Sequence, residues 1–148
     1  MRLAGRAFSL LVAVAAGVVA SPTRAGETVR LGACLSLTGP AAVYGAQQKA
    51  GVLAAVDEVN GSGALGGVKL EAVVEDDAST KEQGIAVYQR LIGRDRVVAI
   101  VGPTLSNTAT AADPLAQAAR VPVVAVSNTA PRGITDIGDY VWRVSLTE

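Results

Sequence analysis

Two apolar stretches of this sequence end in the same short polar signature, and this repetition constrains the fold more than any other feature. Residues 97–101 and residues 123–126 contain only valine, alanine and isoleucine, which is typical of short buried strands. Serine, asparagine and threonine follow each of them, as Ser106, Asn107 and Thr108 and again as Ser127, Asn128 and Thr129. Ligands of open α/β sheets bind outside the carboxyl ends of the strands. The pattern therefore predicts an edge that holds a small polar ligand without cleaving it.

The rest of the chain continues this alternation of strands and helices. Further strands are expected at residues 29–35, 68–75 and 140–144, and helices at residues 42–60, behind Ser79, and at residues 107–119. Strands that alternate with helices predict a parallel sheet with helices on both faces, joined by right-handed crossovers. The expected fold class is therefore α/β, with a doubly wound parallel sheet.

Two of the predicted helices carry local signals at their ends or inside them. Ser79 and Glu82 have the spacing of a capping box, in which the serine side chain accepts from the Glu82 N–H group. Pro114 removes a backbone donor inside the helix predicted at residues 107–119. We expect a kink or a late helix start there.

The first residues have the character of a secretory signal peptide rather than of the fold. Arg2 and Arg6 precede an apolar run at residues 7–20, and small residues follow it. This run is shorter than the roughly 20 residues that a membrane-spanning helix needs. We expect residues 1–25 to be the signal peptide, with cleavage after Ala25 or, failing that, after Ala20. The remaining chain has a net charge of −3 and no basic stripe, which argues against a nucleic-acid partner.

The cysteine and histidine content excludes several kinds of catalytic and metal site. Cys34 is the single cysteine, so no intramolecular disulfide can form, and its apolar surroundings favour a buried core residue. The chain contains no histidine, which removes Ser-His-Asp and Cys-His catalysis and most zinc sites. We therefore expect no catalytic residues, no metal and no cofactor.

Two motifs have both a functional and a structural interpretation. Asp76 and Asp77 could bind a cation or act as an acid and base, but an exposed pair that caps the following turn is the favoured interpretation. Residues 61–66 match G-x-G-x-x-G, yet they follow a helix and precede a strand, which is the reverse of the dinucleotide-binding context. A turn is therefore expected at residues 61–66.

The candidate ligand-binding residues are the two polar triplets and one tyrosine. Helix capping would explain one residue of the first triplet, since serine and asparagine are good caps. The second triplet precedes Pro131 and has no clear helix behind it. Tyr44, beside Gly45 at the exit of the first strand, is either an ordinary core aromatic or part of the pocket lining.

Five stretches in a fixed order carry a resemblance to a known family. They are residues 35–40 with Tyr44 and Gly45, residues 57–60 with Gly66 and Gly67, Asp76 with Asp77, residues 101–103 with Ser106, and residues 129–131. In this order and spacing they resemble the leucine/isoleucine/valine-type periplasmic substrate-binding proteins of ABC transporters. The resemblance covers residues 28–148.

The resemblance implies one lobe of a two-lobe type I periplasmic binding protein that closes on an amino acid or a related amide. Strand-end loops would grip the ligand through Ser106, Asn107, Thr108, Ser127, Asn128 and Thr129, with Tyr44 near the mouth of the cleft. It also implies a periplasmic location, a membrane permease as partner, and no enzymatic activity.

The position of the last residue adds one further expectation. Glu148 lies about where the family first crosses to its second lobe, so residues 26–148 are expected to be the N-terminal lobe of a longer reading frame, or a degenerate gene product. The missing second lobe would leave the ligand exposed to water, so weak binding or none is expected. A signalling receptor with the same fold is the main alternative, and a nucleotide-dependent enzyme is disfavoured because no phosphate loop is present.

Overall fold

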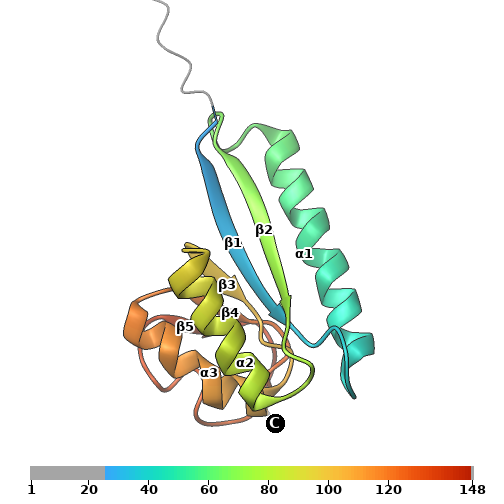
Figure 1. Ribbon diagram of the computed structural model, residues 1–148, viewed down its shortest axis with the longest axis vertical. Coiled ribbons are helices and arrows are strands. Elements are labelled where there is room, and N and C mark those ends of the chain that lie inside the picture. The colour runs from blue at the N-terminus through green and yellow to red at the C-terminus, as the bar shows by residue number, and fades with distance from the viewer. Residues whose placement is uncertain (1–25, 148) are drawn as a thin grey trace, which may run out of the picture.

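A parallel five-stranded sheet forms the centre of the computed structural model, which describes residues 26–147 (Figure 1). The elements in chain order are β1 (Thr28–Leu35), α1 (Ala42–Ser62), β2 (Lys69–Asp76), α2 (Lys81–Gln89), the short π-helix η1 (Arg90–Arg94), β3 (Ala99–Val101), α3 (Ser106–Ala119), β4 (Val123–Ala125) and β5 (Val141–Arg143). The predicted strands and helices are all present. The signal peptide predicted at residues 1–25 lies outside the described residues.

The strand order shows where the chain changes the direction in which it adds strands to the sheet. The strands follow the order β2-β1-β3-β4-β5, and every neighbouring pair is parallel. The chain moves from β1 outward to β2 and then returns past β1 to β3, so the order switches between β1 and β3. This confirms the predicted doubly wound sheet, and such a switch point is where this kind of sheet leaves a crevice for a ligand.

The helices cover the two faces of the sheet unequally. Side chains alternate along β1, so Leu31 faces α1 whereas a Cβ on Gly32 would meet Leu91 behind α2. Helices α2 and α3 pack against each other on this second face, and α1 lies alone along β1 and β2 (Figure 1). A right-handed crossover requires this exchange of faces when the direction of winding reverses.

The main hydrophobic core lies between the sheet and the α2/α3 pair. Its fully buried members include Cys34, Val87, Tyr88, Leu91 and Ile100. The predicted burial of Cys34 is therefore confirmed. In contrast, only Gly45 and Val56 of α1 are buried. An apolar groove of about 440 Å³ opens between α1 and the sheet.

Three local predictions need correction. The helix α2 begins behind Thr80, whose Oγ1 accepts from the Gln83 N–H group at 3.3 Å, so Ser79 is not its cap. Ser79 has a positive φ of 59° and instead binds the loop behind β1. Helix α3 starts at Ser106 and runs through Pro114, so the late start expected as one alternative is wrong, and the kink expected as the other stays a prediction. Asp77 is buried rather than exposed.

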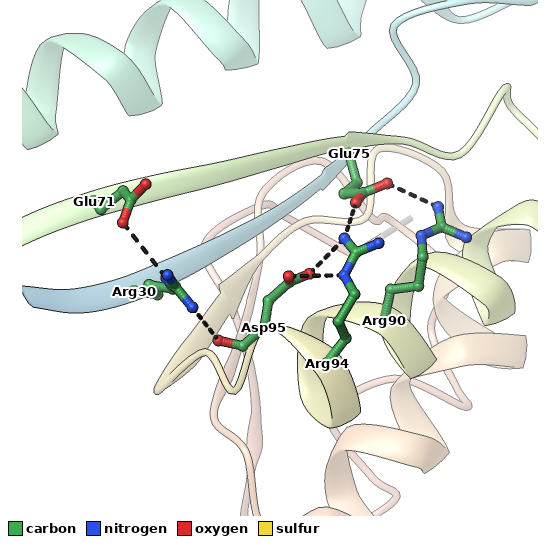
Figure 2. Close-up of polar contacts among 6 residues, drawn as sticks. All are labelled: Arg30, Glu71, Glu75, Arg90, Arg94 and Asp95. Atoms are coloured by element: carbon green, nitrogen blue, oxygen red, sulfur yellow. Dashed lines mark hydrogen bonds and ion pairs between the residues drawn. The ribbon is translucent and has the colours of Figure 1, made fainter.

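Charged side chains cross-link the outer surface of the α2 side (Figure 2). Glu75 on β2 pairs with Arg90 at 2.8 Å and with Arg94 at 2.9 Å, and Arg94 also pairs with Asp95. Hydrogen bonding from Arg90 holds the pKa of Glu75 below its usual value. The network ties β2 to η1. Within residues 26–147, no helix has the length and apolar character needed to cross a membrane.

Candidate functional site

The loops that leave β1, β3 and β4 meet at the carboxyl edge of the sheet and form the candidate site. Gly102, directly after β3, has a φ of +113°, and a Cβ there would overlap the carbonyl oxygen of Cys34 in β1. Only glycine allows this close approach of two backbones at that φ. The loops from β1 and β3 are thereby brought together at the switch point.

Ser106 is the best-placed side chain of the first triplet. Its Oγ accepts the N–H groups of Thr129 at 3.0 Å and Ala130 at 3.3 Å, so it joins the loop after β3 to the loop after β4. Ser106 is not the helix cap, because Leu105 occupies that position and has no capping side chain. Both bonds use Ser106 Oγ as an acceptor, which leaves the hydroxyl proton available to a ligand.

The other two members of the first triplet differ in exposure. Asn107 is exposed on the first turn of α3, whereas Thr108 is buried and its methyl group faces Gly84 of α2. The Thr108 side chain therefore serves the packing between two helices. The first turn of α3 contains no acidic residue, so its positive end attracts an anion, although the Thr108 N–H group already donates to the Leu105 carbonyl at 3.1 Å.

In the second triplet, Ser127 and Asn128 bond to the loop after β3, and Thr129 lies beside Ser106. Ser127 Oγ donates to the Thr104 carbonyl at 2.6 Å and accepts from Gln48 Nε2 at 2.8 Å, so both functions of this hydroxyl are occupied. Asn128 is fully buried and its Nδ2 donates to the Pro103 carbonyl at 3.0 Å. Thr129 is half-buried beside Ser106.

Tyr44 lies on the first turn of α1 and is 63% exposed, so it is not a core aromatic. Together with Thr104, Leu105 and Ser127 it lines a small hollow of about 140 Å³. The structure thus brings one residue of the second triplet next to Tyr44, as well as a threonine that the sequence pattern did not single out.

Gln48 and Thr104 are the two site residues that the sequence analysis missed. Thr104 Oγ1 accepts from the Ser36 N–H group at 2.9 Å and donates to Gln48 Oε1 at 2.7 Å. A usable signal existed for each of them. Gln48 lies one helical turn after Tyr44, and Thr104 lies two residues before Ser106.

The carboxylates behind β2 serve the neighbouring turns, as the favoured interpretation held. Asp76 Oδ1 accepts the N–H groups of Leu37 and Ala78, both at 2.8 Å, and Asp77 Oδ1 accepts from Ser36 Oγ and the Ser79 N–H group. Burial acts to raise the pKa of Asp76, but these hydrogen bonds and those from Thr38 lower it. Residues 26–147 contain no group of three or more side chains suited to hold a metal ion.

A second buried carboxylate lies inside the core and away from this edge. Tyr88 donates its hydroxyl to Asp113 Oδ1 at 2.7 Å, while Asp113 Oδ2 has no hydrogen-bond partner in the described part of the chain. Desolvation raises the pKa of Asp113 to about 7. Burial likewise raises the pKa of the Cys34 thiol, which makes it a poor nucleophile.

Comparison with known proteins shows the family to which the chain belongs. A family model described as periplasmic binding protein matches residues 28–147. The chain belongs to this family. Its sheet and helices form an α/β unit of the type I periplasmic binding fold, and partial coverage of its neighbours fits one lobe.

Curated relatives are binding proteins for amino acids. The chain is 33% identical over 126 residues to a leucine-, isoleucine-, valine-, threonine- and alanine-binding protein of Pseudomonas aeruginosa, covering 85% of this chain and 34% of the relative. It is 41% identical over 87 residues to a Leu/Ile/Val-binding protein homologue of Brucella abortus, covering 59% and 23%.

Solved structures agree with this relationship. The branched-chain amino acid transporter substrate-binding protein LivJ of Streptococcus pneumoniae, in complex with isoleucine, superposes with a TM-score of 0.78 at 30% identity, covering 82% of this chain and 34% of that one. A solute-binding protein of R. palustris in complex with 4-hydroxybenzoate gives 0.71 at 31% identity, covering 82% and 32%. The chain thus spans about a third of the length of the relatives that it matches.

Proposed function

We propose that residues 26–148 form the ligand-binding N-terminal lobe of the periplasmic solute-binding component of an ABC transporter. The single observation that carries this proposal is the arrangement at Ser106. Its oxygen is held by two backbone N–H groups of the loop after β4, and its proton, which no acceptor within residues 26–147 takes, lies beside the amino end of α3. A hydroxyl donor at the positive end of a helix is suited to a carboxylate.

The ligand class follows from this anion site and from the relatives. An amino acid presents its α-carboxylate to Ser106 Oγ and to the N–H group of Asn107, because the Thr108 N–H group already donates to the Leu105 carbonyl at 3.1 Å. The Thr129 hydroxyl contacts a second polar group. Tyr44 covers the ligand from α1. Branched-chain amino acids are favoured because the Pseudomonas aeruginosa relative is named for binding leucine, isoleucine and valine among other amino acids, and LivJ is in complex with isoleucine. In this assignment Ser127 and Asn128 shape the loops through their side chains.

The wider assignment follows the family. Residues 1–25 direct export to the periplasm, and a membrane permease receives the ligand. A signalling receptor built on the same lobe is the alternative, and it requires the same contacts at Ser106.

A titration of the isotopically labelled chain with leucine, isoleucine, valine, alanine and threonine tests the proposal. Because this edge is open to water, hydrogen bonds contribute little net free energy, and we expect dissociation constants of about 1 mM or weaker. Backbone amide shifts should change at residues 106–108 and 129–130. The variant Ser106→Ala should lose these changes, whereas Ser62→Ala at the far end of α1 should keep them.

Two results would overturn the assignment. One is the absence of localised shift changes with any amino acid at high concentration. The other is an unchanged response in Ser106→Ala. Parallel titration with 4-hydroxybenzoate separates a general carboxylate site from one that also selects the α-ammonium group.

A further inference from the structure

A closed ring of hydrogen bonds links α1 to the two loops of the candidate site. Thr104 Oγ1 donates to Gln48 Oε1 at 2.7 Å, Gln48 Nε2 donates to Ser127 Oγ at 2.8 Å, and Ser127 Oγ donates to the Thr104 carbonyl at 2.6 Å. Gln48 is the only member of the ring that comes from α1. Thr104 is buried, and Gln48 and Ser127 are half-buried, so the ring is only partly exposed to water.

The direction of each bond is determined by its neighbours. Gln48 directs its Nε2 to Ser127 and its Oε1 to Thr104, and because Oε1 is an acceptor, Thr104 Oγ1 donates its proton there while it accepts the Ser36 N–H group at 2.9 Å. Ser127 spends its single proton on the Thr104 carbonyl and must therefore accept from Gln48. Position 48 thus requires one acceptor and one donor on the same planar group, which an amide supplies and a carboxylate or an ammonium does not.

The ring also connects two groups of proposed ligand contacts. Tyr44 and Gln48 are four residues apart on α1 and therefore lie on one face of the helix. On the other side of the ring, Ser127 begins the segment whose Thr129 and Ala130 N–H groups hold Ser106 Oγ. Gln48 therefore links the helix that carries Tyr44 to the loop that holds the Ser106 hydroxyl.

Gln48 also lies where the apolar groove under α1 meets the polar carboxyl edge of the sheet. It lines the end of the apolar groove under α1, together with Val52, Val101 and Val126, while its amide belongs to the polar edge. The remaining groove lining offers no other polar side chain that could make this connection.

We propose that Gln48 is a positioning residue for the ligand site, holding Tyr44 of α1 in register with the Ser106–Thr129 edge through Thr104 and Ser127. Gln48 acts on the ligand through these neighbours rather than by touching it. This inference rests on the proposed function, since it concerns the same site.

The first test needs no ligand. Gln48→Met keeps the length of the side chain and the helix propensity but removes both hydrogen bonds, and Gln47→Met at the exposed neighbouring position is its matched control. Amide hydrogen exchange of Thr129 and Ala130 should become about tenfold faster in Gln48→Met, with little change in β1 and none in the control. Equal exchange in the two variants would overturn the proposal, whether or not the protein binds amino acids.

The second test separates positioning from simple stabilisation. In the titration described above, Gln48→Met should weaken amino-acid binding about fivefold to tenfold. The same substitution in a Tyr44→Ala background should cost much less, because Gln48 acts through Tyr44. Equal losses in both backgrounds would overturn this role. Failure of the wild type to bind any amino acid would overturn the proposed function and with it the ligand role of Gln48, whereas the exchange test still decides whether Gln48 orders the loops.

Discussion

The two faces of the sheet show opposite ways of packing a helix. On the α2/α3 face, Val87, Tyr88 and Leu91 are fully buried, and the two helices share a continuous core with the strands. On the α1 face, a helix of 21 residues buries only two of them and leaves an apolar groove of about 440 Å³. The same strands therefore support a tightly packed layer on one side and an open layer on the other.

The difference shows which contacts stabilise the domain and which position its site. Helix α1 is attached at both ends. Near its beginning Gly45 lies against the Ser36 backbone and Gln48 reaches the loops, and near its end Asn60 exchanges two hydrogen bonds with Leu70 of β2. Between these ends, its apolar side chains face the groove. We infer that the α2/α3 face supplies most of the folding free energy, and that α1 serves chiefly to place Tyr44 at the edge.

The largest expected effect concerns the buried carboxylate on the tightly packed face. The folded-state pKa of Asp113 is about 7 and the unfolded value is near 3.8, so the folded protein binds the extra proton and stability falls as pH rises from about 4 to 7. The linked loss amounts to at most about 4 kcal/mol. Because the chain has no histidine, the window from pH 5 to 7 chiefly isolates Asp113.

Urea unfolding at several pH values measures this slope. Asp113→Asn keeps an acceptor for the Tyr88 hydroxyl and should flatten the decline between pH 5 and 7. Asp57→Asn, on the exposed surface of α1, should leave the slope as in the wild type. A decline that persists in Asp113→Asn would contradict the assignment.

The next effect compares two leucines on opposite faces. Leu91→Ala removes a fully buried side chain from the core and should lower the free energy of unfolding by roughly 3 kcal/mol. Leu70→Ala, at the partly exposed lining of the groove, should cost about 1 kcal/mol because solvent already reaches it. Similar losses from both, measured by urea unfolding, would show that the α1 face is as well packed as the other.

Two glycines of α1 sharpen the comparison within one helix. A Cβ at Gly45 would overlap the Ser36 carbonyl oxygen, so Gly45→Ala should destabilise the protein by about 2 kcal/mol. Gly51 has open space around it, and Gly51→Ala should stabilise by about 0.5–1 kcal/mol through helix propensity. Thermal unfolding should therefore shift in opposite directions, and a shared direction would show that the first turns of α1 are not closely packed at Gly45.

The smallest effect belongs to the ion pairs on the outer surface (Figure 2). Arg90 lowers the pKa of Glu75, so the stability that this pairing supplies is present above the unfolded pKa and disappears as pH falls. Glu75→Gln should cost less than about 1 kcal/mol at neutral pH, because Arg90 and Arg94 remain solvated. High salt should reduce the difference from the wild type, and a cost of several kcal/mol would give these pairs a larger structural role.

The spacing of apolar residues was sufficient to predict the strands and helices, because a buried element needs apolar side chains at regular positions in its own sequence. The alternation of apolar runs predicted the parallel α/β sheet, and the apolar surroundings of Cys34 predicted its burial. The caps were harder to predict, since Ser79 and Thr80 both have a suitable side chain. Thr80 has the extended backbone of a helix N-cap, whereas Ser79 has a positive φ of 59°, so Thr80 is the cap.

The sequence by itself determined that hydroxyl and amide side chains gather at the carboxyl edge, because strand direction alone places the residues that follow each strand there. Only the tertiary structure decided how those groups are used. Ser127 donates its proton to Thr104 and accepts from Gln48, whereas the Ser106 proton has no acceptor among the described residues. The physical reason is that a hydroxyl has one proton to give, and its recipient depends on residues distant in sequence that folding brings within about 3 Å.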